Sequence, residues 1–148
     1  MPQSLSGILL HLVFSTKNRA PLIDSKVQEE LWRYMAGICK ACGCMPHRVG
    51  GMPDHIHMSC SFSRTITVAK LLEEIKKSSS KWMKTKGVPS FGWQNGYGSF
   101  SIAETDLGDL VAYIDGQEQH HRKQGFQDEY REFLRKHNVP FDERYMWD

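Results

Sequence analysis

Residues 55–62 read HIHMSCSF and alternate between polar and apolar side chains. Every second residue from Ile56 to Phe62 is apolar, and those between are histidine or serine. Since successive side chains of a β-strand point to opposite faces, the run predicts a strand with one face in a core and one polar face. Gly50, Gly51 and Pro53 predict a turn immediately before it.

The sequence on either side of this run predicts the remaining strands and helices. The stretch GILLHLVFS is rich in aliphatic residues, as in a buried strand, whereas SKVQEELWRYMAGICKAC has apolar residues at helical spacing. Strands are predicted at residues 7–15, 44–51, 55–62 and 98–102. Helices are predicted at residues 24–42, 65–84, 105–124 and 127–137.

The order of these elements is strand, helix, strand, strand, helix, strand, followed by two helices. This βαββαβ order predicts an α+β fold of the ferredoxin-like (RRM-like) type, in which an antiparallel sheet has helices packed on one face. A C-terminal helix would carry Tyr113, and the other face of the sheet would stay open for a ligand or a partner. We expect residues 1–148 to form a single domain, because a chain of 148 residues can bury a core of its own.

Composition and charge exclude several classes of protein. Hydrophobic residues make up 40% and charged residues 24%, which is ordinary for a globular protein. No apolar stretch approaches the roughly 20 residues of a membrane span, and the N-terminus lacks the features of a signal peptide. We therefore expect a cytoplasmic protein with reduced cysteines and no membrane partner. The net charge of +2 does not by itself indicate nucleic-acid binding.

Lysines and aromatic residues are nevertheless concentrated in one part of the chain. No acidic residue lies between Glu74 and Glu104. Lysines neutralise phosphates and aromatic rings stack on bases, which suits single-stranded nucleic acid. A solvated lysine face beside a core-facing tryptophan produces the same pattern. The candidate phosphate contacts are Lys76, Lys77, Lys81, Lys84 and, in the loop after the first strand, Arg19.

Two separate stretches carry side chains that can bind a metal ion. His55 and His57 are two residues apart on a predicted strand, so both imidazoles point to the same face, although two histidines on a polar face can also be incidental. In the helix near residue 113, Tyr113 and Gln117 are four residues apart and lie one above the other, with His121 one turn further on. A tyrosine packed on the sheet beside an exposed glutamine is the simpler interpretation of that helix.

Together the two stretches can perform phosphoryl-transfer chemistry. A phenol with an ordinary pKa near 10 is a poor nucleophile unless its target is strongly activated. A divalent ion held by His55, His57 and Gln117 would polarise a phosphate, and Tyr113 would then attack phosphorus and form a phosphotyrosine. Asp54 can orient one imidazole through its second nitrogen.

These segments resemble the single-tyrosine HUH transposases (TnpA type) of small bacterial insertion sequences. The signature of histidine, bulky hydrophobic residue and histidine is matched at residues 55–57, and the tyrosine motif is matched by YIDGQ at residues 113–117. The stretches HLVFSTKNRAPLI, FGWQNGYGSFSI and GFQDEYREFLRKHNVPFDERYMWD also fit, so the resemblance covers essentially the whole chain. Gly116 stands where the family often has a side chain, and can loosen the helix before Gln117.

The resemblance implies a DNA transposase whose single domain spans residues 1–148. It would cut and rejoin single-stranded DNA with hairpin ends through a 5′-phosphotyrosine and a free 3′-hydroxyl. Tyr113 would be the nucleophile, and Mg²⁺ or Mn²⁺ would be bound by His55, His57 and Gln117, with His121 as an alternative ligand. The protein would be a homodimer in which the tyrosine helix of one subunit completes a composite active site with the histidines of the other.

Three other interpretations remain open. A catalytically silent relative would bind single-stranded or hairpin DNA with the same fold. A histidine-triad nucleotide hydrolase would need a third histidine where this chain has Ser59. A structural zinc site could use Cys39, Cys42 and His47, but the expected second pair of ligands is missing.

Overall fold

The structure is a computed structural model and describes residues 2–148. The strands are β1 (Leu9–Ser15), β2 (Met45–Met52), β3 (His55–Ser61) and β4 (Gly98–Ile102). The helices are α1 (Gln28–Ala41), α2 (Val68–Thr85), α3 (Leu107–Asp115), α4 (Gln117–His121) and α5 (Phe126–Lys136). Two short 3-10 segments, η1 (Lys17–Arg19) and η2 (Glu104–Asp106), follow β1 and precede α3.

The four strands form one antiparallel sheet in the order β2-β3-β1-β4. Together with the helices α1 and α2, this topology confirms the predicted ferredoxin-like α+β fold. Strand β1 is central and every one of its residues is buried, which explains its nearly continuous apolar sequence.

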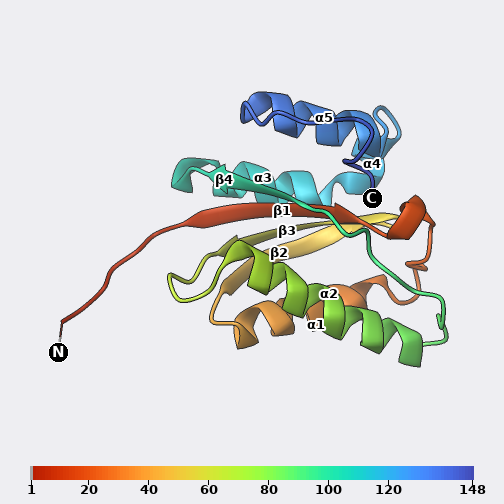
Figure 1. Ribbon diagram of the computed structural model, residues 1–148, viewed down its shortest axis with the longest axis horizontal. Helices are drawn as coiled ribbons and strands as arrows, with labels where there is room; N and C mark the ends of the chain where they lie inside the picture. Colours follow the sequence, from red (N-terminus) through yellow and green to blue (C-terminus); the bar gives the residue numbers. More distant parts are fainter. Residues whose placement is uncertain (1) are drawn as a thin grey trace.

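Helices α1 and α2 pack beneath one face of the sheet (Figure 1). The buried residues of this layer form the larger hydrophobic core, to which β1 contributes Leu12 and Phe14 and β3 contributes Ile56 and Met58. The alternation along β3 is therefore confirmed, since its apolar positions face the two helices. At the start of α2, the Thr67 side chain accepts a hydrogen bond from the Lys70 amide at 3.1 Å and caps the helix.

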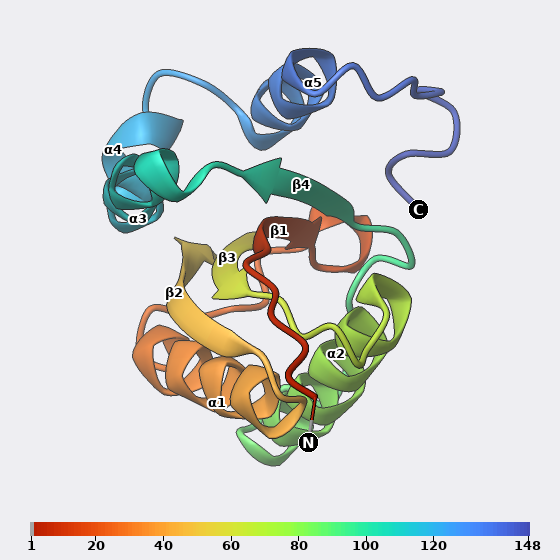
Figure 2. The ribbon, with the colours of Figure 1, turned by 90° about the vertical axis from the view of Figure 1, so that its left-hand side faces the viewer.

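The opposite face of the sheet is covered rather than open. Helices α3, α4 and α5 lie over it, as Figure 2 shows. Phe126, Tyr130 and Leu134 of α5 are buried with Val13 and Phe100 of the sheet in a second hydrophobic core. The prediction of an open face was wrong because α5 has its own apolar stripe, which loses contact with water only by packing on the sheet. His55 and His57 are consequently only 1% and 0% exposed.

The tyrosine-bearing helix is interrupted, whereas the sequence predicted one helix over residues 105–124. Helix α3 ends at Asp115, and Gly116 adopts φ −91° and ψ 15° before α4 begins at Gln117. A glycine inside a helix costs about 1 kcal/mol relative to alanine, so the break falls where the helix is intrinsically weakest. Helix α4 then ends at His121, three residues before the predicted end.

The cysteine-rich segment shows no zinc site. Cys39, Cys42, Cys44 and Cys60 are all free thiols. Within residues 2–148 the one group of three or more potential metal ligands lies elsewhere and includes no cysteine. The structural-zinc interpretation is therefore not supported. Among the helices that the structure describes, none is long and apolar enough to cross a membrane.

Close packing between α3 and β2 should make Gly50 sensitive to substitution. A Cβ atom at Gly50 would lie 2.7 Å from the Ile114 Cγ2 atom and 3.2 Å from the Ile114 carbonyl oxygen. We expect Gly50→Ala to lower the free energy of unfolding by about 1–3 kcal/mol, because α3 has to shift away from the sheet. Urea denaturation monitored by circular dichroism measures the change.

Gly37 provides the matched control for Gly50. It lies in α1, and a Cβ atom there would meet nothing within 4 Å. Gly37→Ala should therefore stabilise the protein by up to about 1 kcal/mol. Equal unfolding free energies for Gly50→Ala and wild type would contradict the close contact between α3 and β2.

Candidate functional site

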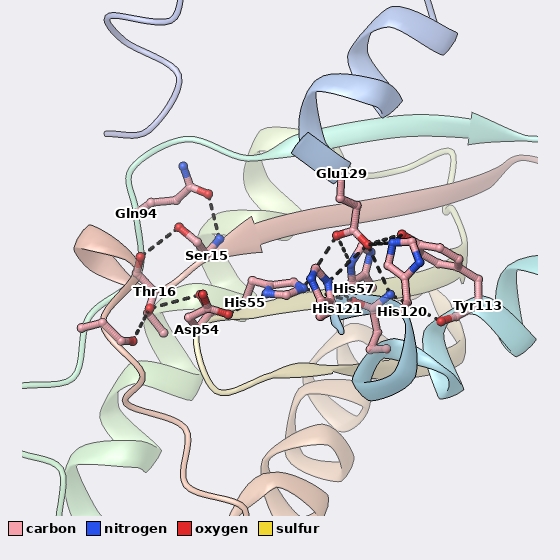
Figure 3. Close-up of polar contacts among 12 residues, drawn as sticks. Ser15, Thr16, Asp54, His55, His57, Gln94, Tyr113, His120, His121 and Glu129 are labelled. Carbon is pink, nitrogen blue, oxygen red and sulfur yellow. Dashed lines mark hydrogen bonds and ion pairs between the residues drawn. The ribbon is translucent and has the colours of Figure 1, made fainter. Parts of the chain in front are cut away.

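The histidine pair of β3 forms the floor of a buried polar cluster. The two rings lie on the face of the sheet that α3, α4 and α5 cover (Figure 3). The Nδ1 atom of His55 lies 2.8 Å from Asp54 Oδ1, which fixes the orientation of that ring as the sequence predicted. Although burial alone would raise the pKa of the Asp54 carboxyl, its hydrogen bond with His55 holds the pKa below its usual value.

Gln117 reaches this floor from the first turn of α4. Its Oε1 atom lies 3.1 Å from His55 Nε2 and 2.9 Å from His121 Nε2. The side chain is only 1% exposed. The structure therefore brings together the four side chains to which the sequence assigned a metal ion: His55, His57, Gln117 and the alternative ligand His121.

A carboxylate that the sequence analysis did not identify occupies the centre of the cluster. Glu129 of α5 is 1% exposed, and its Oε1 atom lies 3.0 Å from His57 Nε2. Its Oε2 atom lies 3.1 Å from His120 Nε2 and 3.4 Å from His121 Nε2. Burial alone would raise the pKa of Glu129, but the hydrogen bonds from His121 and His57 hold this pKa well below its usual range. Glu129 is therefore an anion.

Tyr113 lies beside this carboxylate. Its hydroxyl group donates a hydrogen bond to Glu129 Oε2 and lies 2.9 Å from His120 Nε2. Its ring packs edge-on against the His57 ring, with 5.7 Å between ring centroids. Burial, followed by the charge of Glu129, raises the pKa of Tyr113, so the side chain is a neutral phenol at pH 7.

A third buried histidine contacts His57 on the side away from Glu129. His11 of β1 is 0% exposed, and its Nε2 atom lies 2.8 Å from His57 Nδ1. Burial and the neighbouring His57 hold the pKa of His11 well below the ordinary value. His11 therefore stays neutral and fixes which nitrogen of His57 faces the cluster. Its other nitrogen, Nδ1, is buried and has no hydrogen-bond partner among residues 2–148.

The cluster has the composition and spacing of a metal site. One ligand atom from each of His55, His57, His121 and Glu129 lies within 4.8 Å of the others. Imidazole nitrogens and carboxylate oxygens are common ligands of divalent ions. Residues from β3, α4 and α5 thus fit a divalent cation, the class of cofactor that the sequence predicted.

The family of the chain agrees with this chemistry. Residues 4–117 match the family described as Transposase IS200 like. The chain belongs to this transposase family. The matched segment contains both histidines of β3, Tyr113 and Gln117, and it ends before α5.

Solved structures of transposases share the fold. A putative transposase from Deinococcus radiodurans is 18% identical with a TM-score of 0.62, over 79% of this chain and 95% of that chain. A REP-associated tyrosine transposase bound to a REP hairpin is 16% identical with a TM-score of 0.60, over 82% of this chain and 72% of that chain. No curated protein matches this chain. At these identities the likeness to the solved structures shows the common fold.

The lysines proposed to contact phosphates lie far from the cluster. They belong to α2, on the opposite side of the sheet (Figure 2). Lys77, Lys81 and Lys84 are exposed, but the Lys76 ammonium donates to the carbonyl oxygens of Gln94, Asn95 and Gly96 at 2.9, 3.2 and 2.7 Å. Lys76 therefore anchors the loop before β4 and has no ammonium hydrogen left for a phosphate.

Arg19 is better placed than the lysines. It is exposed at the end of η1, and its positive charge helps to lower the pKa of Asp54, which holds His55. Arg19 is thus a predicted basic residue whose charge acts on Asp54, the partner of His55.

A cavity gives access to Tyr113. It has a volume of about 470 Å³ and lies between the end of β4, α3 and α5. Tyr113, His120 and Glu129 line it on the side of the cluster, and Asp106, Asp109 and Glu132 add carboxyl groups to its wall. A phosphate that enters this cavity meets mostly negative charge, so a bound cation would be needed to offset the repulsion.

The sequence contains patterns that indicate the burial of Glu129 and His11. In α5, Phe126, Tyr130 and Phe133 define the apolar stripe, and Glu129 lies on that stripe at the same helical spacing. His11 likewise interrupts an otherwise apolar strand. A charged residue is rarely buried unless it is paired, so a glutamate on a buried stripe indicates a buried partner.

The buried histidines should make the stability of the metal-free protein depend on pH. Burial lowers the pKa of His11 and of His57, so the unfolded chain takes up protons near pH 6.5 that the folded chain does not. Burial alone would also lower the pKa of His121, but its contact with Glu129 raises it, and this residue acts in the opposite direction. Two lowered pKa values against one raised value leave a net loss of stability as the pH falls below about 6.5.

Urea denaturation in EDTA between pH 8 and pH 5.5 measures this dependence. We expect a slope of up to about 1.4 kcal/mol per pH unit for wild type, the value for one net proton. The control variant His11→Phe should flatten the slope, because the remaining contributions of His57 and His121 oppose each other. An unchanged slope in His11→Phe would contradict the buried, neutral state of His11.

Proposed function

We propose that this member of the IS200-like transposase family cleaves and rejoins single-stranded DNA through a covalent phosphotyrosine on Tyr113. The observation that carries the proposal is the position of the Tyr113 hydroxyl group beside the cluster of His55, His57, His121 and Glu129. A nucleophile and a set of ligands for a divalent ion thus share one site, which is what a phosphoryl transfer to tyrosine requires.

The metal ion is proposed to be bound by His55, His57 and Gln117, with His121 within reach of the same position. The ligand atoms of the three histidines belong to one group within 4.8 Å, and the Gln117 oxygen contacts two of them. When bound, Mg²⁺ or Mn²⁺ would act as a Lewis acid and stabilise negative charge on the phosphate oxygens. Asp54 and His11 keep the two rings of β3 in the orientation that such binding needs.

The side chains around Tyr113 hold the nucleophile in place. Glu129 accepts a hydrogen bond from the phenol, and His120 Nε2 lies 2.9 Å from the phenol oxygen. In the reaction the Tyr113 oxygen bonds to phosphorus and the bond from phosphorus to the 3′ oxygen of the preceding nucleotide breaks. The phenol proton is released as the leaving oxygen gains one, which yields a 5′-phosphotyrosine and a 3′-hydroxyl. Rejoining is the reverse reaction with a different 3′-hydroxyl.

The proposed substrate is single-stranded DNA with hairpin ends. A REP-associated tyrosine transposase with the same fold was solved bound to a REP hairpin. For the present chain, the cavity beside Tyr113 offers a place for the scissile strand, and Arg19, Lys77, Lys81 and Lys84 are exposed cations available to neutralise phosphates elsewhere.

A silent DNA-binding relative is the second candidate. It would share the fold, the family and the affinity for hairpins, and would form no covalent adduct. The intact set of Tyr113, His55, His57 and Gln117 around one site supports the enzyme instead. The adduct assay below separates the two candidates directly.

Tyr113→Phe should abolish adduct formation. Wild type and variant would be incubated with single-stranded DNA from the flanks of the element, labelled at either the 5′ or the 3′ end, with and without Mg²⁺ or Mn²⁺. We expect wild type to form a metal-dependent adduct, stable in SDS, that carries the 3′ label, and Tyr113→Phe to form none while it still binds the DNA.

Tyr97→Phe is the matched control, since Tyr97 is an exposed tyrosine before β4. It should form the adduct at the wild-type rate. Binding of DNA by wild type without any adduct would favour the silent relative, and an adduct that survives in Tyr113→Phe would assign the nucleophile to another residue.

The active site is proposed to be complete within one subunit. The Tyr113 ring packs against His57 of its own chain, so the composite arrangement implied by the family resemblance is not required. A homodimer remains a prediction. Mixing Tyr113→Phe with His57→Ala should not restore adduct formation, because neither chain has a complete set of residues. Recovery of a substantial fraction of the wild-type adduct would instead demonstrate composite sites shared between subunits.

A further inference from the structure

Glu129 is a buried carboxylate whose surroundings are arranged for a cation. Its Oε1 atom lies 3.0 Å from His57 Nε2 and 3.7 Å from His55 Nε2, and its Oε2 atom lies 3.4 Å from His121 Nε2. The Glu129 side chain is 2% exposed, and within the described part of the chain its ion-pair partners are all histidines. Burying a carboxylate is costly unless it is paired with charge or coordinates a metal ion.

The hydrogen-bonding capacity of His55 also indicates a bound cation. A neutral imidazole has one donor nitrogen and one acceptor nitrogen. His55 Nδ1 faces the Asp54 carboxylate at 2.8 Å, so the proton of a neutral ring belongs there. His55 Nε2 is then an acceptor, and it faces the Gln117 Oε1 atom at 3.1 Å. The Glu129 Oε1 atom lies 3.7 Å from the same nitrogen, so rotation of the Gln117 amide would remove one repulsive contact only, whereas a bound cation would offset both.

We propose that Glu129 is a ligand of the metal ion together with His55, His57 and His121, and that this site takes a transition-metal dication such as Mn²⁺ or Zn²⁺ in preference to Mg²⁺. The inference rests on the metal site of the proposed function but not on cleavage of DNA. It keeps His55 and His57, and it assigns His121 and Glu129 in place of Gln117. Glu129 comes from α5, outside the residues that match the transposase family.

The preference for a transition metal follows from the donor atoms. Three imidazole nitrogens and one carboxylate oxygen suit Mn²⁺ or Zn²⁺, whose affinity for nitrogen ligands exceeds that of Mg²⁺. Mg²⁺ favours oxygen ligands and keeps several of its waters, which a cluster only 0–1% exposed at His55, His57 and Glu129 has little room to hold. The ligand atoms already lie within 4.8 Å of one another, so small movements of the side chains bring them to one ion.

Binding of the ion would also join α5 to the sheet. His55 and His57 come from β3, His121 comes from α4, and Glu129 comes from α5. An ion that binds these residues only in the folded state stabilises the arrangement of all three elements. Thermal unfolding should therefore shift to higher temperature with Mn²⁺ or Zn²⁺, and less with the same concentration of Mg²⁺.

Calorimetric titration without DNA tests the role of Glu129. Mn²⁺, Zn²⁺ and Mg²⁺ would be titrated into metal-free wild type, Glu129→Gln and Glu132→Gln. Glu132 is the matched control, because it lies on α5 and lines the cavity but does not belong to the ligand group. We expect wild type and Glu132→Gln to bind one Mn²⁺ or Zn²⁺ at least tenfold more tightly than Mg²⁺, and Glu129→Gln to bind these ions at least tenfold more weakly. Equal affinity of Glu129→Gln and wild type would overturn the proposal, as would equal affinity of wild type for Mn²⁺ and Mg²⁺.

X-ray absorption of the Zn²⁺-loaded wild type provides a measurement that needs no variant, in case Glu129→Gln does not fold. Three imidazoles and a carboxylate oxygen at about 2.0–2.2 Å are expected. A shell with two imidazoles would overturn the proposal.

Failure of this inference is distinguishable from failure of the proposed function. If the protein binds metal through Glu129 but forms no DNA adduct, the metal site is supported and the transposition chemistry is rejected. An adduct formed by a protein whose metal affinity does not depend on Glu129 would support the transposition chemistry and reject Glu129 as a metal ligand.

Discussion

The contact between Glu129 and the imidazoles of β3 is the interaction on which the site depends. It places one negative charge, on a carboxylate that is almost fully buried, between imidazole rings of the sheet and of α4. A carboxylate in that position is tolerated only because several donors, or a bound cation, surround it. The same contact adds a polar interaction to the apolar stripe by which α5 packs on the sheet.

Covering the sheet changes the character of the histidine pair. On an open sheet, His55 and His57 would be hydrated, and burial would not lower the pKa of His57. Beneath α4 and α5 they are excluded from water, and burial lowers the pKa of His57. A neutral imidazole presents a free lone pair, which is the state that binds a metal ion. The helices that close the site therefore also keep His57 in the neutral state that metal binding requires.

The break at Gly116 lets one short segment present several functional groups to this floor. Tyr113 precedes the break, and Gln117, His120 and His121 follow it within five residues. All four side chains contact one another or Glu129. The motif that the sequence shares with transposases is thus a compact arrangement of Tyr113 and the side chains around it, and the glycine separates α3, which packs on β2, from α4.

The sequence by itself determined the sheet, the alternation along β3 and the identity of Tyr113, His55, His57 and Gln117 as candidates. These features are local, because strand periodicity, helical spacing and motif order depend on neighbours within a few residues. Only the tertiary structure decided that α5 covers the second face, that Glu129 and His11 join the cluster, and that Lys76 is used within the chain. Those outcomes depend on contacts between residues far apart in the sequence, where burial and charge pairing decide the result. His11 and His57 are 46 positions apart, and His57 and Glu129 are 72 positions apart. The local sequence does not determine which partner a buried side chain contacts.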